Sequence, residues 1–570
     1  MYKRVSRTER TIARFVLGSI GGLVMLVLVC WGGSKLYGEW QERHALRRAA
    51  AFLSGGDVKA AALSARRAFQ LNPHSLEAVR MLATIQEVAA VPTALDWRRM
   101  AVQMAPGSAA DKIALASCAL KFAEIPIAAK TLAEVGEGDK TVAYHAAAGQ
   151  LAEAQNKLQE AREHWARAAQ LAPGEKEYEM RLATVKLRLP DPADREMARA
   201  TLQELRKVSG QRTAATRALI ADGANRRSSQ VVLKLAQELK DYPEASFQDA
   251  LLYLDILKQL RHPDYTSYLT EIETKAAANA NDLALLIAWM NKNKLSALAL
   301  NYTNGLDAKI LNVWPVPLTI AESYSNLSDW AGLEALAKAH PWEGFEFLRH
   351  AYLARAFREQ GQSVAAEREW TAAKKEASGQ AKLVSALVRT VIEWRWVDEA
   401  ADLLWTLTKD PAQKEEALSS LYRYYSEAGD TGGLFRTLLR LVEIMPQDLS
   451  LQNNMAQLGL LLGAEPERVR KIAADLHRKE PKNPAFLSTY AFSLYSKGDA
   501  AGAVEAMAAL PQEKLREPAY AAYYGVFLAA AGETEKAWVY LQLGSGVKLL
   551  PEEKALLEKA QSKIAAPAAE

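Results

Sequence analysis

The chain has 570 residues, of which 71 are basic and 67 acidic, and 49% of all residues are hydrophobic. Because the two signs of charge nearly cancel and no basic cluster is flanked by stacking aromatic residues, we do not expect nucleic acid as a partner. Two cysteines, Cys30 and Cys118, provide neither a disulfide framework nor a set of metal ligands.

A membrane anchor is predicted near the start of the chain. A basic segment, residues 1–14, precedes twenty uncharged residues from Phe15 to Ser34. At about 1.5 Å per residue, a helix of that length matches the roughly 30 Å core of a bilayer. The sequence therefore predicts a transmembrane helix over residues 15–34. A cleaved signal peptide is the less favoured alternative, because the stretch is long and its exit lacks a small-x-small processing site.

The charges that flank this span predict its orientation. Five basic residues precede it, and four basic and two acidic residues follow it closely. This difference places the N-terminus inside and the rest of the chain outside the cytoplasm, and we expect a bacterial inner-membrane protein. Gly18 and Gly22 form a Gly-x-x-x-Gly pair through which two spans could pack as a homo-oligomer. Because glycine is common in membrane helices, the alternative is that Gly18 and Gly22 have no role in packing.

Glycines recur at a fixed period in the C-terminal part of the chain. Gly361, Gly429, Gly498 and Gly532 are separated by 68, 69 and 34 residues. A period near 34 residues is typical of helix hairpins stacked into a solenoid. Such a protein buries its core between neighbouring hairpins and leaves a long surface for partners.

The residues around each glycine repeat as well. Gly429-Asp430 follows Tyr422 and Tyr425 and precedes a run of leucines that ends at Pro446. Such a glycine ends one helix in the left-handed conformation, the aspartate caps the next, and the proline stops it. With small residues where two helices meet and large ones in the adjoining gaps, this pattern resembles the tetratricopeptide repeat family.

The resemblance covers an N-terminal array at residues 42–173 and a C-terminal array at 347–550. Residues 174–346 are predicted to form degenerate repeats of the same kind, residues 551–565 a polar-faced capping helix, and residues 566–570 a tail. We therefore expect an all-α, right-handed α-solenoid of tetratricopeptide and tetratricopeptide-like hairpins, preceded by one transmembrane helix.

No motif for catalysis or cofactor binding is found. The eight histidines lack metal-ligand spacing, and phosphate-binding loops, nucleophile elbows and dinucleotide-binding glycine clusters are all missing. We expect neither an enzyme nor a cofactor. Eight tryptophans fall within 117 residues, where core packing is favoured over an exposed aromatic strip; they are Trp289, Trp314, Trp330, Trp342, Trp370, Trp394, Trp396 and Trp405.

The family resemblance also implies where partners would bind. In tetratricopeptide proteins the first helix of each hairpin lines a concave channel that holds an extended peptide or a helix. The residues in those slots of the C-terminal array are Ser419, Arg423, Asn453, Asn454, Gln457, Ser488, Thr489, Phe492 and Tyr495. Amides, hydroxyls and rings suit hydrogen bonding to a peptide backbone. That these residues merely keep an inner surface soluble is an equal alternative at any one position.

These features predict a membrane-anchored scaffold that gathers protein partners along its concave surface, in envelope assembly, secretion or polysaccharide export. A structural membrane protein that associates with itself and has no dedicated peptide groove is the alternative. A third hypothesis, an enzyme with its site in the degenerate middle region, would need clustered titratable groups, and the sequence offers none.

Overall fold

The computed structural model describes residues 37–411, 413–546 and 548–565. The predicted basic segment, the transmembrane helix over 15–34 with Gly18 and Gly22, and the tail over 566–570 lie outside these residues. Within the described part, no helix combines the length and the apolar composition that crossing a membrane requires.

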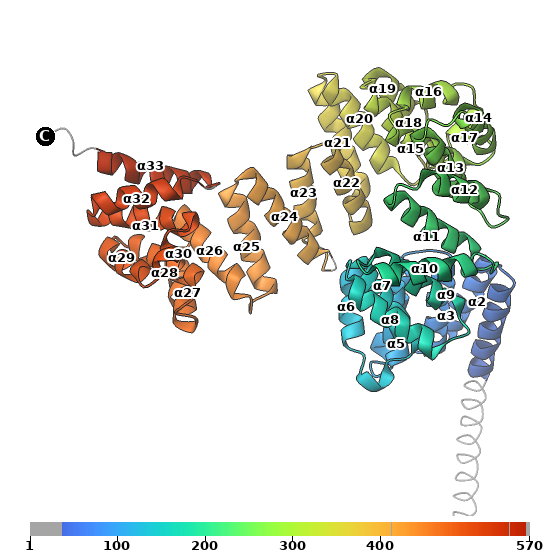
Figure 1. The fold of residues 1–570 in the computed structure, drawn as a ribbon, viewed down its shortest axis with the longest axis horizontal. Coiled ribbons are helices and arrows are strands. Elements are labelled where there is room, and N and C mark those ends of the chain that lie inside the picture. Colours follow the sequence, from blue (N-terminus) through green and yellow to red (C-terminus); the bar gives the residue numbers. More distant parts are fainter. Residues whose placement is uncertain (1–36, 412, 547, 566–570) are drawn as a thin grey trace, which may run out of the picture. The chain divides into compact units, whose positions relative to one another are not determined.

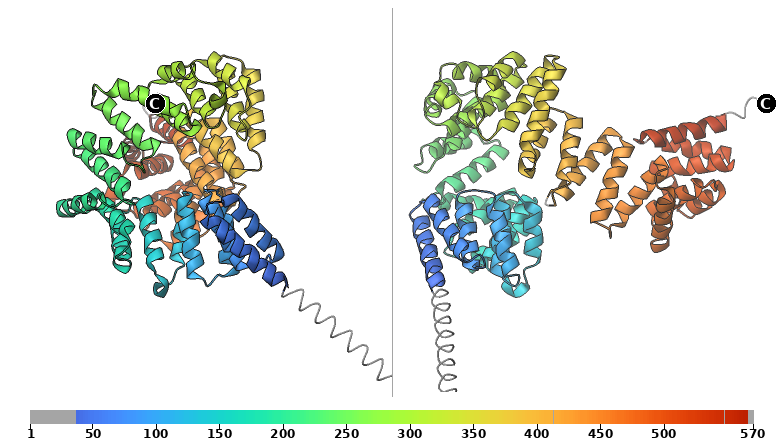
Figure 2. Two further views of the ribbon diagram at one scale, coloured as in Figure 1. Left: turned by 90° about the vertical axis from the view of Figure 1, so that its right-hand side faces the viewer. Right: turned by 180° about the vertical axis from the view of Figure 1, so that it is seen from behind.

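The described residues form helices joined by short turns, with no β-strand among them. The chain divides into two compact units, Met1–Thr274 and Lys275–Glu570. Within each unit, helices that follow one another in the chain lie side by side as antiparallel pairs (Figure 1), and two further views show the same neighbours (Figure 2).

Unit 1 begins with a helix over residues 37–54. It continues with α2 (Val58–Leu71), α3 (Leu76–Val88), α4 (Ala94–Met104), α5 (Ala109–Lys121), α6 (Ile125–Ala133), the 3₁₀ turn η1 (Glu137–Asp139), α7 (Val142–Ala154), α8 (Leu158–Leu171), α9 (Lys176–Arg188), α10 (Pro192–Leu205), α11 (Arg212–Asn225), α12 (Ser229–Lys240), α13 (Phe247–Gln259) and α14 (Tyr265–Ala276), whose last residues belong to unit 2.

Unit 2 continues the hairpins. Its helices are α15 (Ala280–Lys292), α16 (Ser296–Thr303), α17 (Ala308–Leu311), α18 (Val316–Asn326), α19 (Trp330–Ala339), α20 (Glu346–Glu359), α21 (Ser363–Ala377), α22 (Ala381–Glu393), α23 (Val397–Leu407), α24 (Lys414–Ala428), α25 (Thr431–Ile444), α26 (Leu449–Leu462), α27 (Pro466–Lys479), α28 (Pro484–Tyr495), α29 (Ala500–Ala508), α30 (Gln512–Leu515), α31 (Pro518–Ala531), α32 (Thr534–Gly544) and α33 (Pro551–Ala565). Helical pairs thus also fill residues 174–346, and α33 has the bounds of the predicted cap.

The turns inside the hairpins have the predicted chemistry. Gly429 adopts φ +69° at the end of α24, and the Asp430 side chain accepts a hydrogen bond of 2.8 Å from the Gly433 amide at the start of α25. The Gly498-Asp499 turn between α28 and α29 is built in the same way, with φ +92° at Gly498. A left-handed glycine followed by a capping carboxylate therefore reverses the chain.

Prolines lie just beyond the ends of second helices, as predicted. The helix α2 ends at Leu71, two residues before Pro73, and α8 ends at Leu171, two residues before Pro173. Each helix stops at or before the residue that a proline forces out of the helical conformation.

Helices of one hairpin meet through small residues. A Cβ atom added to Gly149 of α7 would lie 2.7 Å from Cε2 of Trp165 in α8, a ring that is only 1% exposed. Because glycine leaves room for the indole, the two helices nest ridge into groove.

Successive hairpins of unit 1 are joined by ion pairs between a partly exposed arginine and a buried carboxylate. Arg217 of α11 donates two hydrogen bonds of 2.6 Å to the Asp249 carboxylate of α13, 32 residues later. Arg80 of α3 reaches Asp111 of α5, 31 residues later, at 2.7 Å. Burial raises the pKa of Asp249, but the bonds from Arg217 and Ser246 outweigh it and hold that pKa below its usual range. A buried carboxylate is stable here because it is fully paired.

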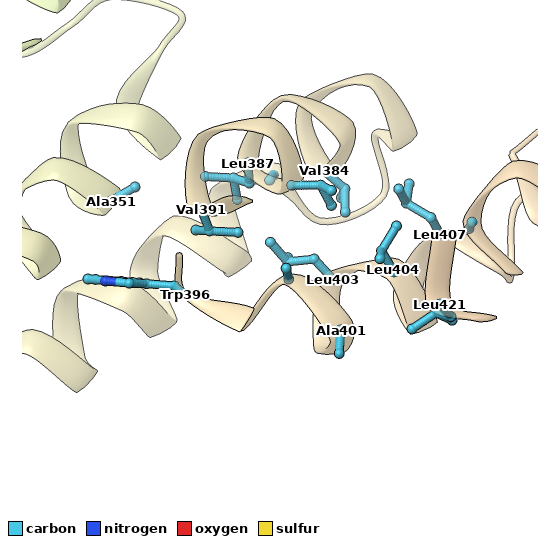
Figure 3. Close-up of a cluster of buried hydrophobic side chains, with 14 of the residues drawn as sticks. Ala351, Val384, Leu387, Val391, Trp396, Ala401, Leu403, Leu404, Leu407 and Leu421 are labelled. Carbon is cyan, nitrogen blue, oxygen red and sulfur yellow. The ribbon is translucent and has the colours of Figure 1, made fainter. Parts of the chain in front are cut away.

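The core of unit 2 contains most of the clustered tryptophans. Trp342, Trp370 and Trp396 are 3%, 5% and 8% exposed. Trp396 lies among Val391, Leu403 and neighbouring aliphatic side chains from α20 to α24 (Figure 3). The other five rings of the set are buried or half-buried, which agrees with core packing and not with an exposed aromatic strip.

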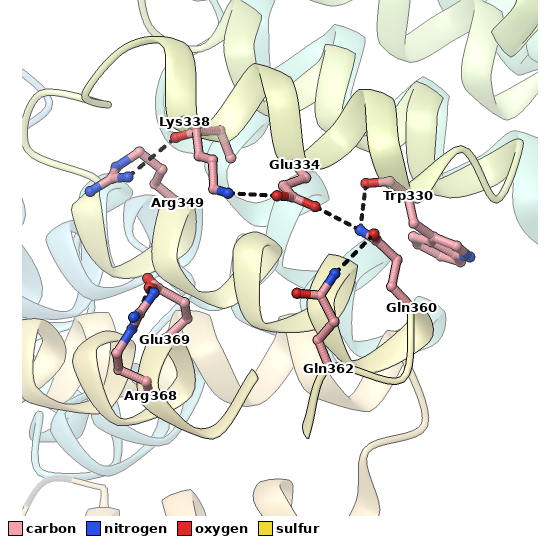
Figure 4. Close-up of polar contacts among 9 residues, drawn as sticks. Trp330, Glu334, Lys338, Arg349, Gln360, Gln362, Arg368 and Glu369 are labelled. Atoms are coloured by element: carbon pink, nitrogen blue, oxygen red, sulfur yellow. Dashed lines mark hydrogen bonds and ion pairs between the residues drawn. The ribbon is translucent and has the colours of Figure 1, made fainter. Parts of the chain in front are cut away.

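Polar side chains connect the surface of neighbouring hairpins in unit 2. Gln360 at the end of α20 donates to the Glu334 carboxylate of α19 at 2.9 Å and to the Trp330 carbonyl at 3.3 Å (Figure 4). Lys338 contacts the same carboxylate. These contacts fix the rotation of one hairpin relative to the previous one.

Glu322 of α18 is a half-buried acid whose pKa is raised. Burial, together with the nearby Glu393 carboxylate, raises the pKa of Glu322 to about 7. The Glu322 carboxyl group therefore holds its proton to a higher pH than an exposed glutamate does.

We expect Gly149→Val to weaken the α7–α8 hairpin. The new side chain must displace the Trp165 ring, at a cost of about 1–3 kcal/mol. The weakening of the hairpin should appear as faster hydrogen exchange of the α7 and α8 amides. The control, Ala143→Val at an exposed position of α7, should cost only about 0.5 kcal/mol of helix propensity. Equal protection in both variants would contradict the close approach.

We expect the stability of unit 2 to fall as pH rises from about 5 to 7. In that window the folded state holds a proton on Glu322 that the unfolded chain has lost, so raising the pH favours unfolding. Glu322→Gln should remove this dependence and stabilise the protein at pH 8 by about 1–3 kcal/mol. Urea unfolding followed by tryptophan fluorescence measures both effects. Glu376→Gln, at an exposed site, should leave the pH profile unchanged.

Candidate functional site

The candidate binding surfaces lie on the first helices of the hairpins. In unit 1 these are α3, α5, α7 and α9, and in the C-terminal part of unit 2 they are α24, α26, α28 and α31. Each first helix packs against its own second helix, and α5 also packs against α7, and α26 against α28. Side chains on their remaining face form a continuous surface.

Side chains on the first helices of unit 1 line an open groove of about 520 Å³. We call it the N-terminal groove. Its lining residues are Glu87, Ser117, Cys118, Leu120, Lys121, Gln150, Glu153, Ala154 and Arg181. They come from α3, α5, α7 and α9, so a ligand in this groove would contact four successive hairpins.

The acidic side chains of the N-terminal groove already have partners. Arg98 donates two hydrogen bonds to Glu87, at 2.6 and 3.1 Å. The Trp165 indole Nε1 donates to Glu153 at 2.7 Å. These carboxylates are therefore structural, and the groove keeps few free acceptors.

A few polar side chains of the groove remain available. Ser117 is exposed on α5 and Gln150 is half-buried on α7, whereas Lys121 of α5 already donates its Nζ to the Glu87 carbonyl. The Arg181 guanidinium lies 5.9 Å from the Trp165 ring, and its Nε is buried without a hydrogen-bond partner among the described residues. An occupant with carbonyl or carboxylate oxygens would satisfy these donors.

Cys118 lies at the floor of this groove but has no nucleophilic role. The thiol is 2% exposed, and burial together with Glu87 raises the pKa of Cys118 to about 12. Because the thiolate is the reactive form, the side chain behaves as a small apolar group at neutral pH.

The nine residues predicted to line a groove in the C-terminal array fall into two groups. Asn453, Ser488, Thr489 and Phe492 are buried, with exposures of 3%, 8%, 2% and 4%. The other five are exposed or half-buried, and they are Ser419, Arg423, Asn454, Gln457 and Tyr495. Of these, Ser419 and Arg423 are exposed on α24.

The buried group is covered by the next first helix. Phe492 of α28 contacts Tyr523 and Phe527 of α31, with ring centroids 5.2 and 6.3 Å apart. Tyr495 contacts Phe527 at 5.3 Å. The slots of α28 therefore form the interface between two hairpins and not a free surface.

Two of the remaining slots border a hollow of about 400 Å³ whose other side is formed by a later segment of the chain. Asn454 and Gln457 of α26 and Tyr422 and Ser426 of α24 line one side, and residues 548–550 with Glu553 line the other. We call this hollow the C-terminal groove. Gln457 donates to the Tyr523 hydroxyl at 3.0 Å and is not free to bind a partner.

The lining of the N-terminal groove was not predicted from the sequence. Ser117, Lys121, Gln150 and Arg181 lie on first helices, as do the residues chosen in the C-terminal array. The hairpin pattern around Gly149 would have located Gln150, because it follows that glycine directly.

Two histidines meet unexpectedly in unit 1. The Nδ1 atoms of His145 in α7 and His164 in α8 lie 3.1 Å apart, and burial lowers the pKa of both. Among the residues that the structure describes, no three His, Cys, Asp or Glu side chains gather in a way that could hold a metal ion.

Comparison with known proteins gives little beyond the fold. No protein-family model and no curated protein matches the chain. Among solved structures it is similar to the crystal structure of the APC/C hetero-tetramer Cut9–Hcn1, at 12% identity and a TM-score of 0.27, over 80% of this chain and 96% of that chain. It is also similar to a tetratricopeptide repeat protein from Parabacteroides merdae, at 16% identity and a TM-score of 0.24, over 43% of this chain and 97% of that chain. At these TM-scores neither likeness bears on function.

The chain's own hairpins are the better guide. Left-handed glycines with capping aspartates, prolines after second helices and a glycine–indole contact inside one hairpin all match the repeat pattern. The chain is an all-α helical-repeat protein that resembles the tetratricopeptide repeat family.

Proposed function

We propose that the protein is a membrane-anchored scaffold that binds extended segments of partner proteins in its N-terminal groove. The observation that carries this proposal is a groove of about 520 Å³ that crosses four first helices and offers the Ser117 hydroxyl, the Gln150 amide and the Arg181 Nε as donors. An extended backbone supplies acceptors at regular intervals, and many weak contacts spread over several hairpins would hold it.

The anchor in this proposal is the apolar stretch over residues 15–34. The helix that follows it carries Tyr37 and Trp40, each 60% exposed, with ring centroids 6.0 Å apart. Trp40 also stacks on His44 at 5.4 Å. Exposed aromatic rings next to an apolar span are typical of the membrane–water interface, which supports an anchor at this end.

The charge difference across the span favours exposure of the repeats outside the cytoplasm, in an envelope assembly, secretion or polysaccharide export process. In this role binding is the activity, and the protein performs no chemistry on its partners.

The role of the N-terminal groove is tested by replacing two of its donor side chains with carboxylates. Gln150→Glu combined with Arg181→Glu places carboxylates where an occupant's oxygens would lie. We expect crosslinked partners recovered from native membranes to fall at least fivefold, because the loss of two contacts and the added repulsion act together. Arg167→Glu on α8 repeats the Arg→Glu substitution on an exposed site outside the groove and should not alter recovery.

Thermal melting of the three proteins should coincide, which separates binding from folding. An unchanged set and yield of crosslinked partners in the double variant would reject the N-terminal groove as the binding surface.

The anchor is tested separately. Removal of residues 1–34 should release the chain from membranes in carbonate extraction, because the apolar span is lost. A cysteine placed at exposed Ser562 should react with an impermeant maleimide added to intact spheroplasts if the repeats face outward. Retention of the shortened chain in the membrane pellet would contradict the anchor, and labelling only after lysis would reverse the orientation.

A further inference from the structure

A short segment near the C-terminus returns to helices that lie more than a hundred residues earlier. We call residues 548–553 the strap. Lys548 Nζ donates a hydrogen bond of 3.2 Å to the carbonyl of Glu427 at the end of α24, 121 residues away. Thr431 at the start of α25 donates its hydroxyl to the Glu552 carboxylate, also 121 residues away. The strap therefore spans back across the C-terminal groove.

A chain of hydrogen bonds fixes the acidic end of the strap. The Tyr523 hydroxyl of α31 donates to Glu553 at 2.6 Å and accepts from Gln457 of α26 at 3.0 Å. The Leu550 amide donates to the same Glu553 carboxylate at 2.9 Å. Tyr523 is only 6% exposed, so these charge-assisted bonds lie in a dry environment where each is strong.

The apolar part of the strap fills space between core regions. Leu550 packs against the core cluster that contains Leu434 and Leu438 of α25. Leu549 packs against the cluster built around α28 and α31. Both leucines are half-buried, and both line the C-terminal groove on the side opposite α24 and α26.

These contacts exceed what a capping helix requires. To cover the last hairpin, α33 needs only to pack on α31 and α32, which it does. The additional bonds run from Lys548 to the Glu427 carbonyl of α24 and from Thr431 of α25 to Glu552, while Tyr523 connects Glu553 to Gln457, a predicted slot on α26.

We propose that the strap is an internal occupant of the C-terminal groove, and that the groove accepts a partner segment of the same chemistry. That segment carries two adjacent leucine-like side chains followed within three residues by a carboxylate. The leucines would enter the places of Leu549 and Leu550, and the carboxylate would accept from Tyr523. A partner must displace the strap, so its apparent affinity is reduced by the fraction of time that the strap is bound. This inference does not rest on the N-terminal groove.

The probe for this inference is a fluorescent synthetic peptide with the sequence of residues 548–561, added to the full chain in detergent. Glu553→Gln in the protein weakens the strap and changes no residue of α24, α25 or α26, so the probe should bind at least fivefold more tightly than to the unaltered chain. Glu558→Gln makes the same charge change on the exposed side of α33 and should leave the affinity unchanged. A probe with Gln at the position of Glu553 should bind Glu553→Gln protein at least fivefold more weakly.

The reverse experiment holds the strap in place. Thr431→Cys with Glu552→Cys, bridged by dibromobimane, should abolish probe binding, and the unbridged double variant should bind at least as well as the unaltered chain. If Glu553→Gln alters thermal melting, Leu550→Ala serves as the weakened strap with the same expectation. Equal affinity for the unaltered, weakened and bridged proteins, or no binding to a weakened variant that melts normally, would overturn the inference.

Discussion

A helix hairpin of this chain cannot bury its apolar surface alone, and this constraint determines the rest of the structure. The glycine–indole contact between Gly149 and Trp165 closes one hairpin, but the outer faces of both helices remain apolar. The next hairpin must cover them, and so on along the chain. A close approach of another kind occurs at the C-terminal end, where a Cβ on Gly544 of α32 would lie 2.5 Å from the Ala522 backbone of α31. Surface for partners remains only where no neighbouring hairpin packs.

Polar contacts then decide how one hairpin is rotated on the previous one. Apolar packing is nondirectional, whereas the paired bonds between Arg217 and Asp249 tolerate little rotation. Arg162 of α8 and Asp194 of α10 form an ion pair, 3.2 Å apart, between two second helices. Since each pair joins equivalent helices about one repeat apart, first helices lie next to first helices and second helices next to second helices. The N-terminal groove depends on that alignment, because its lining comes from four such helices.

Local features could be predicted from the sequence, because their causes are local. The turn at Gly429-Asp430 and the end of α25 before Pro446 depend on residues within a few positions of each other. The groove could not be predicted in the same way. Whether Phe492 faces solvent depends on Tyr523 and Phe527, more than thirty residues later, and on how tightly α31 follows α28. The bonds between the strap and α24 join residues 121 positions apart, a separation that no repeat period encodes.

The two grooves show that one repeat geometry can present different surfaces. In unit 1 the first helices leave their donors open, while in unit 2 a segment of the same chain supplies the acceptor for Tyr523. A tethered segment acts at an effective concentration in the millimolar range, far above that of a typical free partner. Weak individual bonds are therefore enough to keep the C-terminal groove filled, and only a partner with a better-matched segment, or one held nearby by a second contact, can replace the strap. A partner of the N-terminal groove has no internal segment to displace. The two surfaces would therefore bind their partners over different ranges of concentration.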